Sequence, residues 1–287
     1  MTVQPSAAVI VDSTASLPPA LLDGLPLHVV PLRVELDGAT YLDGVEISAE
    51  ELYRRLPLLK CQPKSSAPSP ASFLDAFRLA SGYTQDLLCI TLTATLSGTY
   101  DAARVAAETA LEALPGVRIR VLDSSTVGGA EGLVALAAAR AAGDGRPPSE
   151  VVSIAQGVAE RVHFLGVMET LHYAWSGGHI PRAALWATRL LDIKPVLDIW
   201  RGEVRLLARP RTKANGVLRM LSEMAGRVRG GPLHVMAMHA DARDQAEGPL
   251  AQIEARFPCR DTLIVPFTPV IGAHTGPGLL AVAFYED

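Results

Sequence analysis

Short apolar segments alternate with helical segments through the first half of this chain. The segments that read as strands cover residues 7–11, 29–36, 87–93 and 117–122, and those that read as helices cover residues 48–59, 72–80, 99–114 and 129–142. Strands and helices that alternate in this way form right-handed βαβ units on a parallel sheet. We therefore expect an N-terminal α/β domain with a parallel sheet over residues 1–148.

Residues 62–70, rich in Pro and Ser, are predicted as a loop between two of these helices. Ser48 and Glu51 have the spacing of a capping box, which marks the start of the helix before that loop.

The pattern changes after residues 143–148, which hold two Gly and two Pro and are the best candidate for a linker. Beyond it we expect helices at 149–162, 212–230 and 242–256, helical pieces near 170–190, strands at 163–169 and 233–238, and a hairpin about Trp200, Arg201 and Gly202. A hairpin requires antiparallel pairing. The sequence therefore predicts a second α/β domain, residues 149–287, with a mixed sheet.

The mean hydropathy of +0.23 raises the question of a membrane segment. The longest stretch without charged side chains, residues 262–285, is interrupted by Pro266, Pro269, Pro277 and several glycines, which a membrane-spanning helix tolerates poorly. We read it as two buried strands around a glycine-rich turn. The N-terminus has no basic region and only a short apolar run, so we expect neither export nor membrane insertion, and a cytoplasmic location.

Charge, cysteine content and the absence of known motifs disfavour several kinds of ligand and site. The formal net charge of −4 disfavours nucleic acid as a partner. The three cysteines are far apart and form no disulfide framework or C-x-x-C pair. No metal-binding histidine motif, phosphate-binding loop or G-x-G-x-x-G sequence is present, so we expect no metal and no cofactor.

Small hydroxyl residues follow three predicted strands, at Ser13, at Ser97 and at Ser124. The carboxyl ends of parallel strands share one edge of a sheet, where ligands of open α/β folds bind. The segment Ser97-Gly98-Thr99 is the strongest candidate, because a glycine turn and a helix N-terminus there can direct N–H groups at an anion. The alternative is that these hydroxyls only cap helices.

Two further clusters could bind an anion. Lys64 to Ser69 contains Ser65 and Ser66, although taken alone this segment is more typical of a loop of turn formers and caps for the helix at 72. In the segment Gly272 to Gly278, His274 and Thr275 stand in a glycine-rich turn whose N–H groups can form an anion-binding nest. A histidine there can donate to a carboxylate or phosphate, or it can be purely structural.

Residues 201–229 carry eight Lys and Arg against two Glu. Such a run is usually a solvated face, and the alternative is a docking surface for an acidic partner.

Taken together, these segments resemble the DegV family in order and spacing. The resemblance is carried by Val9 to Pro18, Val30-Pro31-Leu32, Tyr41-Leu42-Asp43, Ser65 to Ser69, Leu96 to Tyr100, Asp192 to Pro195 and the turn that contains His274. It implies two α/β domains with a long-chain fatty acid bound between them, and no reaction carried out by the protein itself. In some bacteria, such proteins present the fatty acid to a separate fatty acid kinase.

When the family's binding residues are matched to this sequence by position, the resemblance implies that the fatty-acid carboxylate lies near the hydroxyls of Ser65 and Ser97 and near His274. The complete set of expected ligand-binding residues is Ser65, Ser66, Ser97, Gly98, Thr99, His179, His274 and Thr275. Two positions depart from the family pattern: Ala67 replaces a common glutamine, and His179 replaces an arginine after the Gly-Gly pair. The second departure weakens the case for the same kinase partner.

An acyl hydrolase or transferase is the alternative function. It would use Ser97 as nucleophile and His274 as base, which requires hydrogen-bond contact between them. The usual G-x-S-x-G sequence is absent, because Thr95 stands where its first glycine would be.

Overall fold

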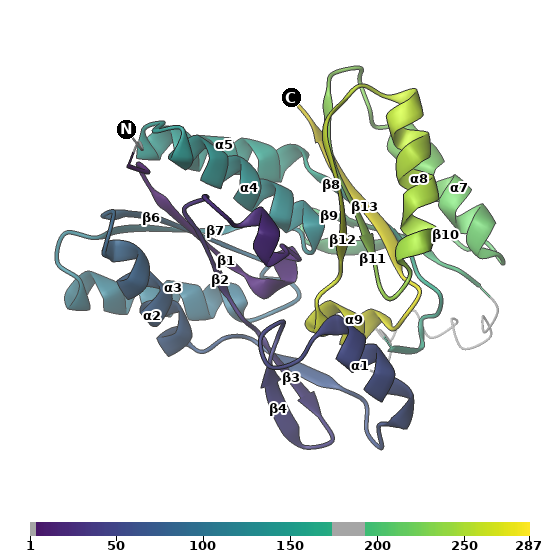
Figure 1. Ribbon diagram of the computed structural model, residues 1–287, viewed down its shortest axis with the longest axis horizontal. Coiled ribbons are helices and arrows are strands. Elements are labelled where there is room, and N and C mark those ends of the chain that lie inside the picture. Colours follow the sequence, from purple (N-terminus) through teal and green to yellow (C-terminus); the bar gives the residue numbers. More distant parts are fainter. Residues whose placement is uncertain (1–3, 174–192) are drawn as a thin grey trace. The chain divides into compact units, whose positions relative to one another are not determined.

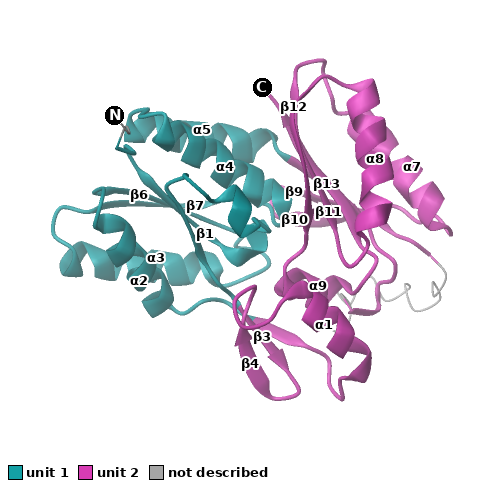
Figure 2. Cartoon of the chain, in the orientation of Figure 1, with its two compact units in different colours: residues 1–32, 66–162 teal, residues 33–65, 163–287 magenta. Residues whose placement is uncertain are grey.

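The computed structural model describes residues 4–173 and 193–287. Two compact units make up the chain: unit 1 comprises residues 1–32 and 66–162, and unit 2 comprises residues 33–65 and 163–287 (Figure 2). The predicted fold class is confirmed, because unit 1 has a parallel sheet and unit 2 a mixed sheet.

The boundary between the two units differs from the one expected between residues 148 and 149. The helix α5 (Pro148–Arg161) packs against α4 (Gly129–Gly143) and so extends unit 1 to residue 162. Residues 33–65 interrupt unit 1 in sequence and belong to unit 2, which hydropathy along the chain did not reveal.

Unit 1 is built on a four-stranded parallel sheet in the order β2-β1-β6-β7. Its strands are β1 (Ala8–Asp12), β2 (Leu27–Val30), β6 (Asp86–Thr91) and β7 (Arg118–Asp123). The helices α2 (Pro70–Ser81) and α3 (Thr99–Ala113) cover one face, and α4 and α5 lie on the other side (Figure 1). Short 3-10 turns, η1 (Ser13–Ala15) and η2 (Pro19–Leu21), follow β1.

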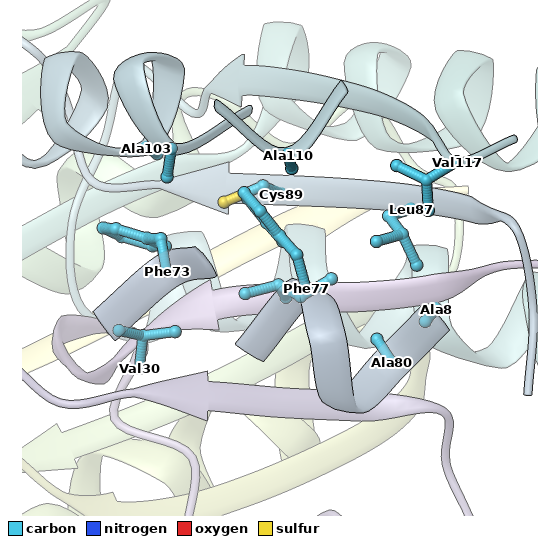
Figure 3. Packing of buried hydrophobic residues seen from close by; sticks show 12 residues of the cluster. Ala8, Val30, Phe73, Phe77, Ala80, Leu87, Cys89, Ala103, Ala110 and Val117 are labelled. Carbon is cyan, nitrogen blue, oxygen red and sulfur yellow. The ribbon is translucent and has the colours of Figure 1, made fainter. Parts of the chain in front are cut away.

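The core under α2 and α3 consists of aliphatic side chains, two phenyl rings and the thiol of Cys89 (Figure 3). Phe73 and Phe77, one helical turn apart on α2, are fully buried against Ile10 of β1 and Cys89 of β6. Small residues of α3, such as Ala103 and Ala106, allow that helix to approach the sheet closely. This packing holds the carboxyl ends of β1, β6 and β7 at a common edge.

Unit 2 contains a six-stranded mixed sheet in the order β10-β9-β8-β13-β11-β12. Its strands are β8 (His163–Val167), β9 (Val196–Trp200), β10 (Glu203–Ala208), β11 (Leu233–His239), β12 (Cys259–Pro266) and β13 (Leu280–Glu286). The predicted hairpin is confirmed, with Arg201 and Gly202 both at positive φ. The helices α7 (Lys213–Ala225) and α8 (Arg243–Arg256) pack their apolar residues onto one face of this sheet.

A smaller, three-stranded sheet in the order β4-β3-β5 also belongs to this part of the chain. It consists of β3 (Arg33–Leu36), β4 (Ala39–Leu42) and β5 (Lys64–Ser66), with α1 (Ala49–Arg55) and the 3-10 turn η3 (Leu56–Leu58) between β4 and β5. Ser48 caps α1 as predicted, because its hydroxyl accepts a hydrogen bond from Glu51 N.

Three local predictions were wrong. The expected single strand at 29–36 is two strands, β2 and β3, separated at Pro31, which has no N–H for a sheet ladder. The expected loop at 62–70 contains β5, whose pairing with β3 depends on backbone groups rather than on an apolar pattern. The expected turn near His274 is largely a helix, α9 (Pro269–Thr275), in which Pro269 occupies the first turn and Gly276 ends the helix.

Candidate functional site

Ser65 and His274, predicted from separate motifs, lie in contact in unit 2. Ser65 is the middle residue of β5, and His274 is in the last turn of α9. Ser65 Oγ and His274 Nε2 are 2.6 Å apart, and both residues are half-buried. A hydroxyl and an imidazole nitrogen at this distance share a hydrogen bond, and each can instead donate to an anion. The pair is therefore suited to hold one carboxylate group.

Contacts in unit 2 fix the position of α9. The buried side chain of Asp43 accepts a hydrogen bond from Val270 N at 2.9 Å, which satisfies one N–H of the first helical turn. Tyr53 of α1 lies directly against Gly272, since a Cβ added there would stand 2.5 Å from the Tyr53 hydroxyl oxygen. Glycine at this position lets α1 and α9 approach closely. Nothing in the sequence indicated a role at the site for either residue: an Asp before a Gly, as at Asp43, is typical of any turn, and Tyr53 lies within a predicted helix.

The turn after His274 is held by side chains from the segment that follows β8. Gly276 and Gly278 both have positive φ, of 72° and 86°, which favours glycine. The ring of Tyr173 fills the space where a Cβ of Gly276 would stand, and the side chain of Glu169 lies 3.0 Å from the corresponding point of Gly278. Both glycines are therefore required by packing as well as by conformation.

An ion cluster connects this turn to β8 and α7. The Lys213 ammonium donates to the carbonyl oxygen of Gly278 and lies 3.6 Å from Glu169 Oε2. Lys194 donates to the backbone oxygen of Glu169 at 3.1 Å and also pairs with its carboxylate. Burial alone would raise the pKa of Glu169, but the hydrogen bond from Lys194 and the charge of Lys213 bring it below its ordinary value. Burial lowers the pKa of Lys213 in spite of the neighbouring carboxylate.

Two other predicted residues stand beside the pair. Ser66 is exposed, and as the next residue on β5 its side chain points to the opposite face of the strand from Ser65. The Thr275 hydroxyl donates to Ile271 O at 2.9 Å, within α9. Its oxygen can still accept a hydrogen bond, but its proton is already used.

The predicted Ser97-Gly98-Thr99 segment lies in unit 1, at the start of α3. Ser97 Oγ accepts from Thr99 N, the first N–H of the helix, at 3.2 Å and lies 2.8 Å from Thr99 Oγ1, although the N-cap residue is Gly98. Thr99 is buried, whereas Gly98 is exposed, and a Cβ at Gly98 would meet no atom within 4 Å. The backbone at Gly98 is therefore open to a ligand.

The other serines at strand ends have structural partners. Ser13 is buried, and its hydroxyl accepts from Leu32 N at 3.0 Å. Ser124 is also buried, with its hydroxyl near Thr126 O at 3.4 Å. These contacts favour the structural interpretation for both residues. His179, expected near the ligand, lies outside the described residues.

Ion pairs within unit 2 engage at least four of the eight Lys and Arg side chains in residues 201–229. Arg205 and Arg227 both bind the fully buried carboxylate of Asp198, at 2.5 and 2.9 Å. Arg219 pairs with Glu223, and Lys213 with Glu169. Because these four cations form ion pairs within unit 2, fewer Lys and Arg side chains of residues 201–229 remain to bind an acidic partner.

Within residues 4–173 and 193–287, no group of three or more His, Cys, Asp or Glu side chains could hold a metal ion. No helix in the same segments is long and apolar enough to cross a membrane.

The chain is similar to known proteins in both sequence and fold. A family model described as "Uncharacterised protein, DegV family" matches residues 6–287. A DegV domain-containing protein of Streptomyces coelicolor is 34% identical over 281 residues, which are 96% of each chain. A solved DegV family protein of Thermus thermophilus, described by its fatty acid binding, has a TM-score of 0.89 and 27% identity over 98% of this chain and 100% of that chain. A stearic acid-binding protein of Eubacterium ventriosum has a TM-score of 0.88 and 26% identity, over 98% of each chain.

Proposed function

The chain belongs to the DegV family, and from this we propose that it binds a long-chain fatty acid whose carboxylate is held by Ser65 and His274. The observation that carries the proposal is the contact of 2.6 Å between Ser65 Oγ and His274 Nε2, two polar groups that a carboxylate can bridge. The fatty acid binding of the relatives from Thermus thermophilus and Eubacterium ventriosum supports the choice of ligand.

Affinity and orientation would come from different parts of the ligand. Burying about sixteen methylene-sized groups at about 0.8 kcal/mol each gives on the order of 13 kcal/mol before the costs of association and of ordering the chain. A carboxylate is costly to bury without hydrogen bonds, and hydrogen bonds to a charged group are stronger than those between neutral groups. The tail would therefore supply the affinity. Ser65 and His274 would bind the carboxylate and so set the orientation of the fatty acid.

Ser97, Gly98 and Thr99 belong to unit 1, and their role in binding the head group stays a prediction. The open backbone at Gly98 supports it. We expect Ser97→Ala to weaken fatty-acid binding by about 1 to 3 kcal/mol, the cost of leaving a charged acceptor without one donor. An unchanged affinity would remove Ser97 from the site.

We further propose that the protein carries its ligand without transforming it and presents it to a separate fatty acid kinase. The family resemblance supports the kinase partner, whereas the replacement of arginine by His179 counts against it. Loaded protein incubated with ATP and an extract of its own host should yield acyl phosphate, trapped as the hydroxamate. No acyl phosphate above an extract-only control would contradict the kinase partnership and leave the binding proposal standing.

The same pair favours one alternative, an acyl hydrolase or transferase. A serine hydroxyl within hydrogen-bond distance of a histidine is the arrangement of a nucleophile and its base. The contact within unit 2 is made by Ser65. Turnover of an acyl ester that disappears in Ser65→Ala would favour the alternative, and absence of turnover would favour simple binding.

Calorimetric titration of delipidated protein with palmitate and with its methyl ester tests the proposed head-group site. We expect palmitate to bind more tightly than the ester, and Ser65→Ala to reduce this preference. Ser66→Ala is the matched control, because its side chain lies on the opposite face of the same strand. Equal affinities for acid and ester in the wild-type protein would contradict a carboxylate site at Ser65 and His274.

A further inference from the structure

Unit 1 contains two acidic side chains that are fully buried. Asp12 is the last residue of β1, and Glu131 lies in the first turn of α4. Both are 0% exposed, and Thr14, which lies between them, is 1% exposed. Neither carboxyl group contributes to the proposed fatty-acid site in unit 2.

The Thr14 hydroxyl touches both carboxyl groups. Its oxygen lies 2.6 Å from Asp12 Oδ1 and 2.7 Å from Glu131 Oε2. A threonine hydroxyl has one hydrogen and can donate only one hydrogen bond. Two ionised carboxylates would leave one of these short oxygen contacts without a hydrogen, and the second hydrogen must therefore come from a protonated carboxyl group.

Hydrogen bonding indicates which group is protonated. Asp12 accepts three hydrogen bonds, from Thr14 N at 3.0 Å, from the Thr14 hydroxyl and from Leu92 N at 2.8 Å, as an ionised carboxylate does. Glu131 meets Thr14 through Oε2, and its side chain also lies within hydrogen-bond reach of Asp12, whereas its buried Oε1 has no hydrogen-bond partner among the described residues. A neutral carboxylic acid tolerates such a position far better than a carboxylate.

The groups that face Glu131 supply no compensating positive charge. Besides Asp12, Asp123 at the end of β7 and the buried thiol of Cys89 on β6 lie near enough to interact electrostatically. Within the described segments, neither Asp12 nor Glu131 forms an ion pair with a Lys, Arg or His. Burial, followed by the charge of Asp12, raises the pKa of Glu131 well above its ordinary value. Burial also raises the pKa of Asp12, but the hydrogen bonds that Asp12 accepts from Thr14 and Leu92 act in the opposite direction.

We propose that Glu131 is a proton-binding site, at which unit 1 takes up one proton from solvent on folding and holds it between Glu131 Oε2 and Thr14 Oγ1. Thr14 then donates its own hydrogen to Asp12. The proton stabilises η1, where Ala15 O packs so closely on α4 that a Cβ at Gly132 would stand 2.5 Å from it. Ser13, the first residue of η1, accepts a hydrogen bond from Leu32 N. Leu32 is the last residue of unit 1 before the chain continues into unit 2.

Infrared spectroscopy and urea unfolding of the full chain test this proposal. At pH 7 exposed carboxyl groups are ionised, so the wild-type protein should show the C=O band of a protonated carboxyl group and Glu131→Gln should not. Asp12→Asn is the control for site assignment: loss of the band in Asp12→Asn but not in Glu131→Gln would place the proton on Asp12 and overturn the proposal.

The unfolding measurement gives an independent readout. A proton held only by the folded state lowers the folding equilibrium constant tenfold for each pH unit above the pKa of the unfolded carboxyl. We therefore compare the folding equilibrium constants of the wild-type protein and of Glu131→Gln. Their ratio, wild type over variant, should fall about tenfold for each pH unit between pH 5 and 7. A ratio independent of pH would overturn the proposal. Should Glu131→Gln fail to fold, absence of the wild-type band at pH 7 would overturn it just as clearly.

Discussion

Ser65 Oγ and His274 Nε2 lie 2.6 Å apart, although 209 residues separate them along the chain. The strand β5 supplies the hydroxyl and the last turn of α9 supplies the imidazole. The chain thus assembles a polar pair from two segments that each look like an ordinary turn in the sequence.

His274→Gln and Ser65→Ala should each weaken fatty-acid binding by about 1 to 3 kcal/mol, because each removes one donor to a charged acceptor. Ser65→Thr retains the hydroxyl and should bind within about 0.5 kcal/mol of the wild-type protein. Calorimetric titration with palmitate measures these affinities. A large loss in Ser65→Thr with none in Ser65→Ala would show that side-chain size, rather than the hydroxyl, controls binding.

Gly272→Ala should destabilise the protein by about 1 to 3 kcal/mol, because the new Cβ would stand 2.5 Å from the Tyr53 hydroxyl oxygen and 2.9 Å from Leu52 Cδ2. Tyr53→Phe should cost little alone, since the buried Tyr53 hydroxyl has no hydrogen-bond partner within residues 4–173 and 193–287. Urea unfolding of the two single variants and the double variant measures their coupling.

In that cycle, Tyr53→Phe should recover part of the stability lost in Gly272→Ala by removing the clashing oxygen. Strict additivity of the two changes would contradict the close packing of α1 against α9.

Lys213→Met should destabilise unit 2 by about 1 to 3 kcal/mol, because the turn after His274 loses the donor to Gly278 O. Lys64→Met is the matched control. Lys64 is 73% exposed and lies 3.7 Å from Glu35 in a surface ion pair, so its loss should change stability by less than about 1 kcal/mol. Equal effects of the two substitutions in thermal unfolding would contradict a role for Lys213 in holding the turn.

Acid should destabilise unit 2 through His163. Burial lowers the pKa of His163 to about 4, and its ring stacks on Trp200 with 4.9 Å between ring centroids. The unfolded chain therefore binds a proton that the folded chain does not, and stability falls as the pH drops from about 6.5 towards 4. Since the ring is partly solvated, we expect a loss on the order of 1 to 2 kcal/mol.

His163→Phe keeps an aromatic ring at that position and removes the titration. Urea unfolding at pH 7 and at pH 4.5 should show a smaller loss of stability in the variant than in the wild-type protein. The same acid sensitivity in both proteins would contradict the contribution of His163.

The sequence predicts well those elements that have a local signal. The strands β1 and β6 are apolar runs bounded by turn residues, β7 alternates arginine with apolar residues before a turn, and Ser48 and Glu51 mark the start of α1. It fails at α9, because Pro269 and Gly276 are typical of turns yet here begin and end a helix of seven residues. It fails also at Pro31, where an apolar run passes from one sheet to another.

Of the candidate site, residue types are predictable and pairings are not. The polar character of Ser65, Ser97 and His274 follows from their motifs. Which serine meets the histidine depends on tertiary contacts that a single sequence does not contain. The contact of Thr14 with Asp12 and Glu131 is of the same kind, since Glu131 stands 117 residues from Thr14 in an alanine-rich helix.

Lipid extraction and mass spectrometry of protein purified under native conditions tests the central claim most directly. The account predicts a long-chain fatty acid at close to one molecule per chain, which a delipidated sample rebinds and a Ser65→Ala, His274→Gln double variant retains poorly. Absence of any acyl species, together with failure of the delipidated protein to bind added fatty acid, would contradict it.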